Sequence, residues 1–181
     1  MSSHGTVRER SSLVYLWLSG AVIVLDQISK AAVERGLQLY QSVSILPVLE
    51  ITRLHNSGAA FSFLASAAGW QRWLFTALAL LVSGVLALLV FAMRGAFRHW
   101  ATRIAVCLLA AGVLGNLTDR ILRHHVVDFL LFNLHVPHAD PWPAFNVADS
   151  CICIGAGLLL LDSWLTGRRR EAVSDSNRPH K

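Results

Sequence analysis

An apolar run from Trp73 to Met93 contains no charged side chain, and it constrains this chain more than any other feature. About 20 such residues in an α-helix cross the hydrocarbon core of a bilayer. Three more apolar stretches, at about 13–33, 104–122 and 144–165, each carry a few charges. Hydrophobic residues make up 54% of the chain and charged residues only 15%, which does not suit an ordinary soluble domain. The sequence therefore predicts an all-α integral membrane protein with four transmembrane helices.

Arginine and lysine residues are unevenly divided between the two sides that four crossings create. The side of the termini holds the larger share, including the run from Arg168 to Arg170. Since positive residues are retained on the cytoplasmic side, we expect both termini to be cytoplasmic. The net charge of +5 does not predict a nucleic-acid partner, because these residues flank apolar runs instead of forming one basic stripe.

The four spans define a single membrane domain over residues 1–166, followed by a polar cytoplasmic tail over 167–181 that we expect to be disordered. A cleaved signal peptide is the alternative for the first span. Asp26 and Lys30 follow its apolar run where a small-residue cleavage site would be needed. We therefore expect the first span to remain in the mature protein.

Two extracytoplasmic loops result, at about 36–69 and 123–143. Within the first loop, β-branched and apolar residues alternate loosely from Ser42 to Leu54, which predicts a small hairpin or β-cradle resting on the membrane. The second loop contains several prolines and Trp142, and we expect it to be irregular.

Polar and ionisable residues gather near the extracytoplasmic ends of three spans. Ionisable groups at membrane depth cost several kcal/mol, so such a cluster is a functional-site hypothesis. Its members are Asp26, Lys30, Asn116, Asp119, Arg120, Asn146 and Asp149, with Asn56 and Asp128 in the loops beside them.

Some of these residues have helical spacing. Asp26 and Lys30 stand at i and i+4, which favours a neutralising pair that holds helices together. Asp119 and Arg120 could form a second pair or belong to a site. Asp128 and Asp149 have no cation on the same turn, as hydrolysis by paired carboxylates requires. Taken singly, Asp149 could instead cap a helix and Asp128 could be a loop acid.

Five segments, in order and spacing, resemble the lipoprotein signal peptidases, which are the bacterial type II signal peptidases. They are Val24-Leu-Asp-Gln-Ile-Ser-Lys30, Asn56-Ser-Gly-Ala-Ala-Phe-Ser-Phe63, Gly115-Asn-Leu-Thr-Asp-Arg120, Val126-Val-Asp-Phe129 and Phe145-Asn-Val-Ala-Asp-Ser150. The resemblance implies cleavage of prolipoproteins on the amino side of a diacylglyceryl-modified cysteine. It implies no metal or cofactor, and it places the enzyme in the bacterial inner membrane with its active site near the extracytoplasmic face. We expect a monomer among membrane lipids.

The resemblance also implies residue roles. Asp128 and Asp149 match the catalytic pair of the family. The matches to positions that line the site are Asn56, Gly58, Asn116, Arg120 and Asn146, and the matches to architectural positions are Asp26, Lys30 and Asp119. One departure is that the usual Gly-Gly-Ala before Gly115 reads Ala111-Gly112-Val113, which bears on close helix contact.

The sequence supports three other classes of protein less well. A proton-coupled transporter would carry its acids near the bilayer midplane and show repeated halves, and a four-span scaffold would not depend on Asp128 or Asp149. A serine peptidase would need Lys30 as base with Ser57 or Ser62.

A metal site is a further alternative for the second outer loop. No zinc motif fits its histidines, which are usually solvated in a wet loop. Its candidate ligands are His124, His125, His135, His138 and Asp140. The cysteines, which all lie in apolar segments, are expected to be packing residues: Cys107, Cys151 and Cys153.

Overall fold

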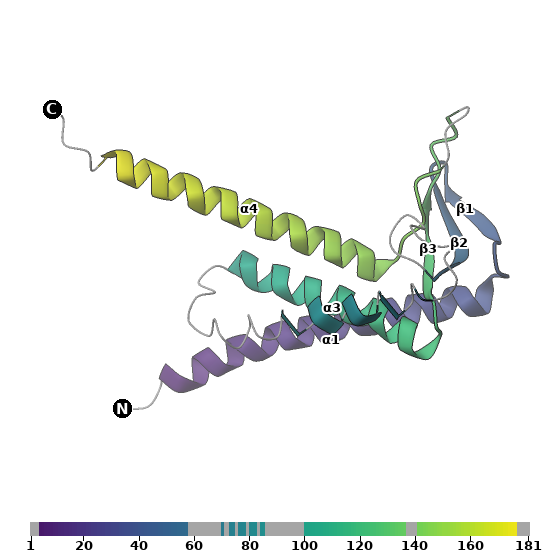
Figure 1. Cartoon of the computed structure of the whole chain (residues 1–181), viewed down its shortest axis with the longest axis horizontal. Coiled ribbons are helices and arrows are strands. Elements are labelled where there is room, and N and C mark those ends of the chain that lie inside the picture. Colours follow the sequence, from purple (N-terminus) through teal and green to yellow (C-terminus); the bar gives the residue numbers. More distant parts are fainter. Residues whose placement is uncertain are drawn as a thin grey trace.

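The computed structural model describes residues 4–57, 70, 73, 74, 76–78, 80–82, 84, 85, 100–136 and 141–176. This part of the chain contains three long helices and a small sheet. The helices are α1 (His4–Gly36), α3 (Trp100–Leu122) and α4 (Val147–Ser176). The sheet contains β1 (Ser42–Leu46), β2 (Leu49–Asn56) and β3 (Val126–Phe132). Figure 1 shows the sheet at one end of the helices and both chain termini at the other.

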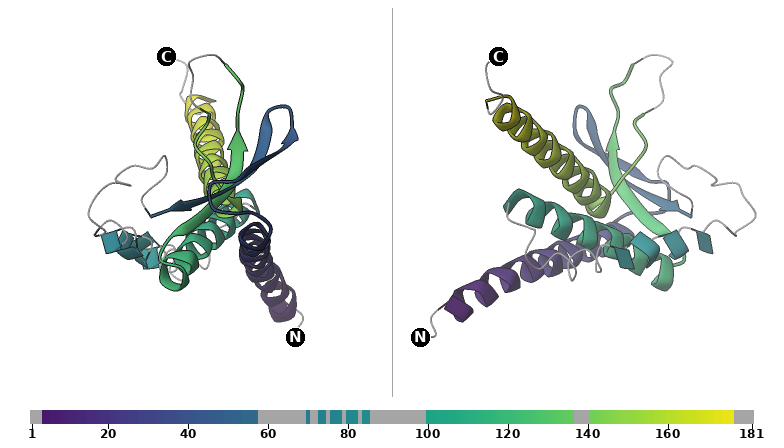
Figure 2. Two further views of the ribbon diagram at one scale, coloured as in Figure 1. Left: turned by 90° about the vertical axis from the view of Figure 1, so that its right-hand side faces the viewer. Right: turned by 60° about the vertical axis from the view of Figure 1, so that its left-hand side comes forward.

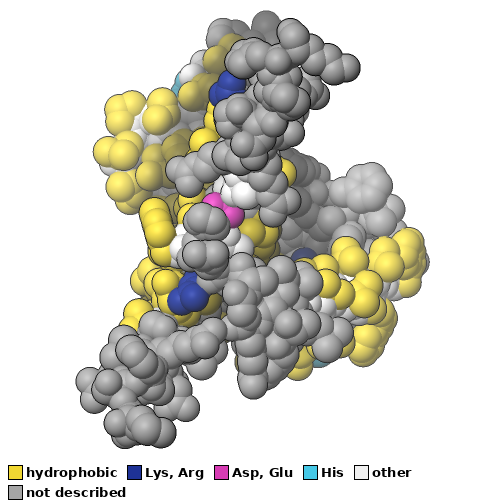
Figure 3. Space-filling model, turned by 90° about the vertical axis from the view of Figure 1, so that its left-hand side faces the viewer, with side chains coloured by type: hydrophobic (Ala, Val, Ile, Leu, Met, Phe, Trp, Pro, Cys, Tyr) yellow, Lys and Arg dark blue, Asp and Glu magenta, His cyan; other side chains and the backbone are white. Residues whose placement is uncertain are grey.

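Among the described residues, two helices are long and apolar enough to cross a membrane, Trp100–Leu122 and Val147–Arg168. Large apolar side chains on α4 face outward, such as Leu160, which is 73% exposed. Figure 3 shows hydrophobic side chains gathered over much of the described surface. Of the expected span at 73–93, the described residues, all between 73 and 85, are helical. The structure is thus mostly helical and carries two candidate membrane helices.

The sheet is antiparallel with the strand order β1-β2-β3. Its first two strands confirm the hairpin expected between Ser42 and Leu54. The expectation of an irregular second loop is wrong for its first part, because β3 pairs with β2 from Val126 opposite Asn56 to Phe132 opposite Leu49. Burial explains this pairing: Val126, Val127 and Phe129 are at most 5% exposed.

Small residues bring α3 and α4 into close contact. Ala105 and Ala148 are fully buried, and a Cβ atom added to Gly112 would lie 2.4 Å from the backbone oxygen of Ala148. A Cβ on Gly155 would lie 2.8 Å from the oxygen of Ala105. Close packing through small residues is typical of helices in a bilayer. Figure 2 shows α1, α3 and α4 meeting beside the sheet.

Helix α4 differs from its expected bounds at both ends. It begins at Val147, since the preceding segment is paired with β3, and not at residue 144. It continues to Ser176, so the expectation of disorder from residue 167 is wrong over the described residues. The arginines after Gly167 extend the helix as good helix formers do.

Candidate active site

Asn146 and Asp149 form a reciprocal cap on the first turn of α4. The backbone N–H of Asp149 donates to Oδ1 of Asn146 at 3.0 Å, and the backbone N–H of Asn146 donates to Oδ2 of Asp149 at 3.1 Å. Asn146 is thus the N-cap and Asp149 the third helical residue, as in a capping box. The interpretation of Asp149 as a cap is therefore partly confirmed. The cap fixes the carboxylate at the positive end of the helix.

Asp128 comes to the same place from β3. Leu130 forms an isolated bridge with Phe145, which holds the segment before α4 along the strand. The Asn146 side chain thereby reaches Asp128, donating from Nδ2 to Oδ1 at 2.7 Å. From the neighbouring strand, Asn56 Nδ2 donates to Oδ2 of Asp128 at 2.9 Å. Both carboxylate oxygens are thus held by amide donors.

A cavity of about 550 Å³ opens beside the two carboxylates. Its polar lining comes from Asp128, Asp149, Asn56, Asn116 and Arg120, and also includes Ser150. Apolar side chains supply most of the remaining wall, among them Leu78, Val82, Val113, Val126, Trp142, Pro143, Phe145 and Ile152. A largely apolar cavity with a few convergent polar groups is the usual form of a binding or active site.

Burial and charge both act on Asp128, which is 4% exposed. Burial, together with the nearby Asp149 carboxylate, raises the pKa of Asp128 to about 7. The amide donors Asn56 and Asn146 and the ammonium of Lys30 oppose this shift. Two acids sharing a buried site cannot both ionise easily, so the pair retains a proton near neutral pH.

Behind the cavity lies a fully buried charge network. Lys30 Nζ lies 2.9 Å from Oδ2 of Asp26 and 2.8 Å from Oδ2 of Asp119, and all three side chains are 0% exposed. The same Nζ donates to Oδ1 of Asn116 at 2.9 Å. This confirms the predicted pair of Asp26 with Lys30. Asp26 also accepts from the backbone N–H of Ala148 at 3.0 Å, which satisfies another donor at the start of α4.

The structure gives Asp119 two basic partners, Lys30 and Arg123. Arg120 lines the cavity, where the charges of Asp149, Asp128 and Asp119 act on its guanidinium. Arg123 lies at i+4 from Asp119 and binds Glu34 as well, so helical spacing could have found it.

Gln27 is a second residue that the sequence prediction missed as part of the site. Its Nε2 donates to Asp26 and Asp119 and to the backbone oxygen of Gly115. Its position next to Asp26 within the first motif was the available signal.

Two alternatives can be tested against this geometry. Lys30 is surrounded by Asp26, Asp119 and Asn116 and is absent from the cavity lining, which argues against a lysine base acting with Ser57.

The loop histidines considered as metal ligands do not cluster in the described part of the chain. His125 stacks on His55, and His135 lies beside Glu50. Gly58, Ser62, His138 and Asp140 lie outside the described residues.

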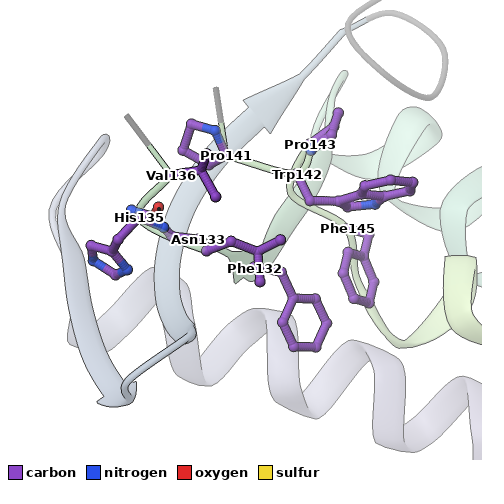
Figure 4. A pocket seen from close by; sticks show the side chains of 9 residues that line it. Phe132, Asn133, His135, Val136, Pro141, Trp142, Pro143 and Phe145 are labelled. Carbon is purple, nitrogen blue, oxygen red and sulfur yellow. Dashed lines mark hydrogen bonds between the residues drawn. The ribbon is translucent and has the colours of Figure 1, made fainter. Parts of the chain in front are cut away.

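A second cavity has a volume of about 540 Å³, and Figure 4 shows the side chains that line it. It lies between the end of β3 and the segment before α4, and Trp142, Pro143 and Phe145 line both cavities. Phe132 and Phe145 stack within it, with ring centroids 5.8 Å apart. An apolar surface thus continues outward from the carboxylates.

Comparison with known proteins identifies the family of the chain. Residues 18–165 match the family model for signal peptidase (SPase) II. The lipoprotein signal peptidase of Shewanella halifaxensis is 46% identical over 158 residues, which is 87% of this chain and 90% of that protein. That of Pseudomonas syringae pv. tomato is 44% identical over 164 residues, covering 90% of this chain and 92% of the other.

A solved bacterial membrane enzyme, determined by the in meso method at 2.3 Å, superposes with a TM-score of 0.73 and 25% identity. It covers 93% of this chain, and 94% of its own chain is matched. A second such structure, at 1.9 Å, gives a TM-score of 0.71 with 26% identity, covering 82% of this chain and 91% of the other. The match of a family model to most of the chain, with relatives above 40% identity, shows that this chain is a peptidase of the signal peptidase II family.

Proposed function

We propose that this peptidase removes signal peptides from prolipoproteins, cutting on the amino side of a diacylglyceryl-modified cysteine, with Asp128 and Asp149 as its catalytic pair. The observation that carries the proposal is that these two carboxylates line one cavity, each held by asparagine side-chain donors. The names of the relatives support the substrate class.

The pair works as acid and base on one water molecule. Asp149 at the start of α4 carries the negative charge, which the helix dipole stabilises, and takes a proton from the attacking water. Asp128, whose pKa is raised to about 7, holds the shared proton and gives it to the carbonyl oxygen of the scissile bond. The tetrahedral intermediate then collapses: the C–N bond breaks as the proton taken by Asp149 passes to the leaving amine, and one hydroxyl proton of the intermediate returns to Asp128 as the C=O bond re-forms.

Neighbouring side chains position the pair and the substrate. Asn116 Nδ2 donates to Oδ1 of Asp149 at 2.7 Å, and Asn56 and Asn146 hold Asp128. Arg120 lines the cavity, where its guanidinium can bind substrate carbonyl groups. Gly58 follows β2 and is assigned to substrate contact from the motif alone. Asp26, Lys30 and Asp119 support the site from behind.

The proposed reaction also fits one orientation of the chain in the membrane. We assign four spans, with both termini cytoplasmic and the active site near the extracytoplasmic face of the bacterial inner membrane. A diacylglyceryl cysteine has its acyl chains in the bilayer and its peptide at the surface, so the scissile bond lies at interfacial depth. The sheet end carries both carboxylates, and the termini lie at the opposite end (Figure 1). The enzyme acts as a monomer, needs no metal or cofactor for the reaction, and has no nucleic-acid partner.

The test compares purified variants in detergent on a diacylglyceryl-modified prolipoprotein, with cleavage followed by gel shift. Asp128→Asn and Asp149→Asn are expected to be folded and inactive. Asp162→Asn is the matched control, since Asp162 lies in α4 away from the cavity and bonds Thr102. It is expected to cleave normally.

Two results would contradict the proposal. Cleavage by all three variants would remove the assignment of the catalytic pair. Absence of cleavage by the folded wild-type chain would remove the substrate assignment.

A further inference from the structure

A cluster of three side chains outside the catalytic cavity has the composition of a metal site. Glu34 from the end of α1, His55 from β2 and His125 from the turn before β3 each offer a ligand atom, and these atoms all lie within 4.8 Å of one another. None of the three lines the catalytic cavity. The cluster lies at the sheet end of the molecule, where α1 meets β2.

The two imidazoles are poorly satisfied as they stand. Their rings stack with centroids 3.7 Å apart and an interplanar angle of 21°. In each ring Nε2 is buried, and among the described residues neither has a hydrogen-bond partner. A buried polar atom without a partner costs about 1–3 kcal/mol, so packing alone leaves two penalties at one place. A cation bound between the two nitrogens would relieve both.

We infer that Glu34, His55 and His125 bind a divalent zinc ion. Two histidines and a glutamate are a zinc ligand set in proteins, with a water completing four-coordination. Ligand nitrogens on a tetrahedral zinc lie about 3.4 Å apart, given Zn–N distances near 2.0–2.1 Å. Closure of the site from 4.8 Å therefore needs side-chain rotation. The two stacked rings must turn out of their nearly parallel arrangement, because an imidazole binds a metal along the in-plane lone pair of its nitrogen.

The surrounding charges set how strong the site is. Arg123 Nε donates to Oε2 of Glu34 at 3.0 Å, which leaves the other carboxylate oxygen to bind the metal. Arg123 and Arg53 repel a cation, and Glu34 attracts it.

Zinc at this position would strengthen the part of the sheet that carries the site. His55 immediately precedes Asn56, whose side chain holds Asp128, and His125 is three residues before Asp128. An ion bound by three elements would tie α1, β2 and the α3–β3 turn together. Because zinc would bind only the folded chain, it is expected to raise the unfolding temperature.

The test is calorimetric titration of ZnCl₂ into the full chain, purified without a polyhistidine tag and stripped with chelator. The wild type is expected to bind one equivalent. His125→Phe keeps a ring to stack on His55 but has no ligand atom, and Glu34→Gln keeps an acceptor for Arg123. Each variant is expected to bind at least about tenfold more weakly, since even an outer partner of a metal site contributes 10- to 100-fold.

His124→Asn is the control, because His124 is exposed, lies next to the cluster, and has a φ of 65° that asparagine tolerates. The His124→Asn protein is expected to bind zinc like the wild type. Zinc is expected to raise the unfolding temperature of the wild type and of His124→Asn, and not that of His125→Phe or Glu34→Gln. Absence of saturable binding to the wild type would overturn the inference. Equal binding by His125→Phe and Glu34→Gln would overturn it too, by placing the ion on other residues.

Discussion

Asn116 has one side-chain orientation that satisfies all of its neighbours. Its Oδ1 accepts hydrogen bonds from Lys30 at 2.9 Å and from Asn146 at 3.2 Å. The other end of the amide, Nδ2, can only donate hydrogen bonds, and it donates to the Asp149 carboxylate. The buried lysine thus fixes the direction of an amide that bonds one member of the proposed catalytic pair. Through this asparagine, a charge network expected to be architectural contacts the candidate site.

Replacing Asn116 with alanine is expected to lower kcat about 100-fold, the effect of removing one preorganised donor. KM should change little, because the donor bonds Asp149. The control is Thr118→Ala on the same helix, whose hydroxyl bonds the backbone oxygen of Leu114. Steady-state kinetics on a lipidated prolipoprotein would check the split. An unchanged kcat in a folded Asn116→Ala protein would contradict this role.

The pH dependence of kcat/KM should show the shared proton. The pKa of Asp128 is raised to about 7, so the protonated acid is present below that pH and is lost above it. Activity should therefore fall as the pH rises past about 7. Asn56→Ala removes a donor that lowers the pKa of Asp128 and should move the alkaline limb to higher pH. A limb that stays in place, or moves to lower pH, would contradict the assignment of Asp128 as the acid.

At the scale of elements, the start of α4 is where the site is assembled. Two backbone N–H groups of its first turn have no partner within the helix. The N–H of Asp149 donates to Asn146, and the N–H of Ala148 donates to Asp26 of α1. The α4 backbone also packs on Gly112 of α3 without room for a Cβ atom. Three helices are therefore fixed relative to one another within one turn of Asp149. A small displacement here would separate the two carboxylates.

Gly112→Ala tests this contact. The new Cβ would meet the backbone oxygen of Ala148 at 2.4 Å and Cγ1 of Ile152 at 2.7 Å, so α4 must move. Overpacking of this kind costs about 1–3 kcal/mol, and a misplacement of about 1 Å can lower the rate by about 100-fold. Gly157→Ala is the matched control, since a Cβ there meets nothing within 4 Å. The rate of cleavage and the unfolding temperature would be measured for both variants. Equal rates and equal unfolding temperatures would contradict the importance of this contact.

Lys30→Met tests the buried network. It leaves Asp26 and Asp119 buried without their shared cation, and breaking a buried pair costs about 3–5 kcal/mol. Thermal unfolding in detergent should therefore occur at a clearly lower temperature than in the wild type. Arg35→Met is the control, because Arg35 is an exposed cation on the same helix. A Lys30→Met protein as stable as the control would show that the ion pairs contribute nothing net.

The sequence predicted an element correctly where its hydrophobic residues followed one clear pattern. The hairpin and the helical residues of the spans followed from alternation and from long apolar runs. Strand β3 was missed because its apolar run contains Asp128 and precedes a proline-rich segment, and only pairing with β2 shows that the run is buried. The carboxylate pair needed the family motifs as well, since the Leu130–Phe145 bridge that places Asn146 beside Asp128 is a long-range contact without a local signal.

At the scale of the whole molecule, charge and shape are polarised along the helices. The sheet and the start of α4, which carries Asp149, lie at one end, and the chain termini lie at the other (Figures 1 and 2). The far end of α4 carries the arginines from Arg168 to Arg170. Positive residues are retained in the cytoplasm, so this polarity supports the proposed orientation, in which the site faces outward. The orientation matters for the proposed function, in which the lipidated cysteine of the substrate lies at the outer surface.

Cysteine labelling would test that orientation. Cys107, Cys151 and Cys153 are first replaced with alanine, and single cysteines are then introduced as Ile45→Cys in β1, which is 58% exposed, and as Ser174→Cys near the C-terminus. A membrane-impermeant maleimide should label the Ile45→Cys protein in intact spheroplasts and the Ser174→Cys protein only after permeabilisation, with the cysteine-free chain unlabelled throughout. Labelling of Ser174→Cys before permeabilisation would put the C-terminus outside. The even number of crossings would then be wrong, or the whole chain would be inverted and the carboxylates would face the cytoplasm, away from the substrate.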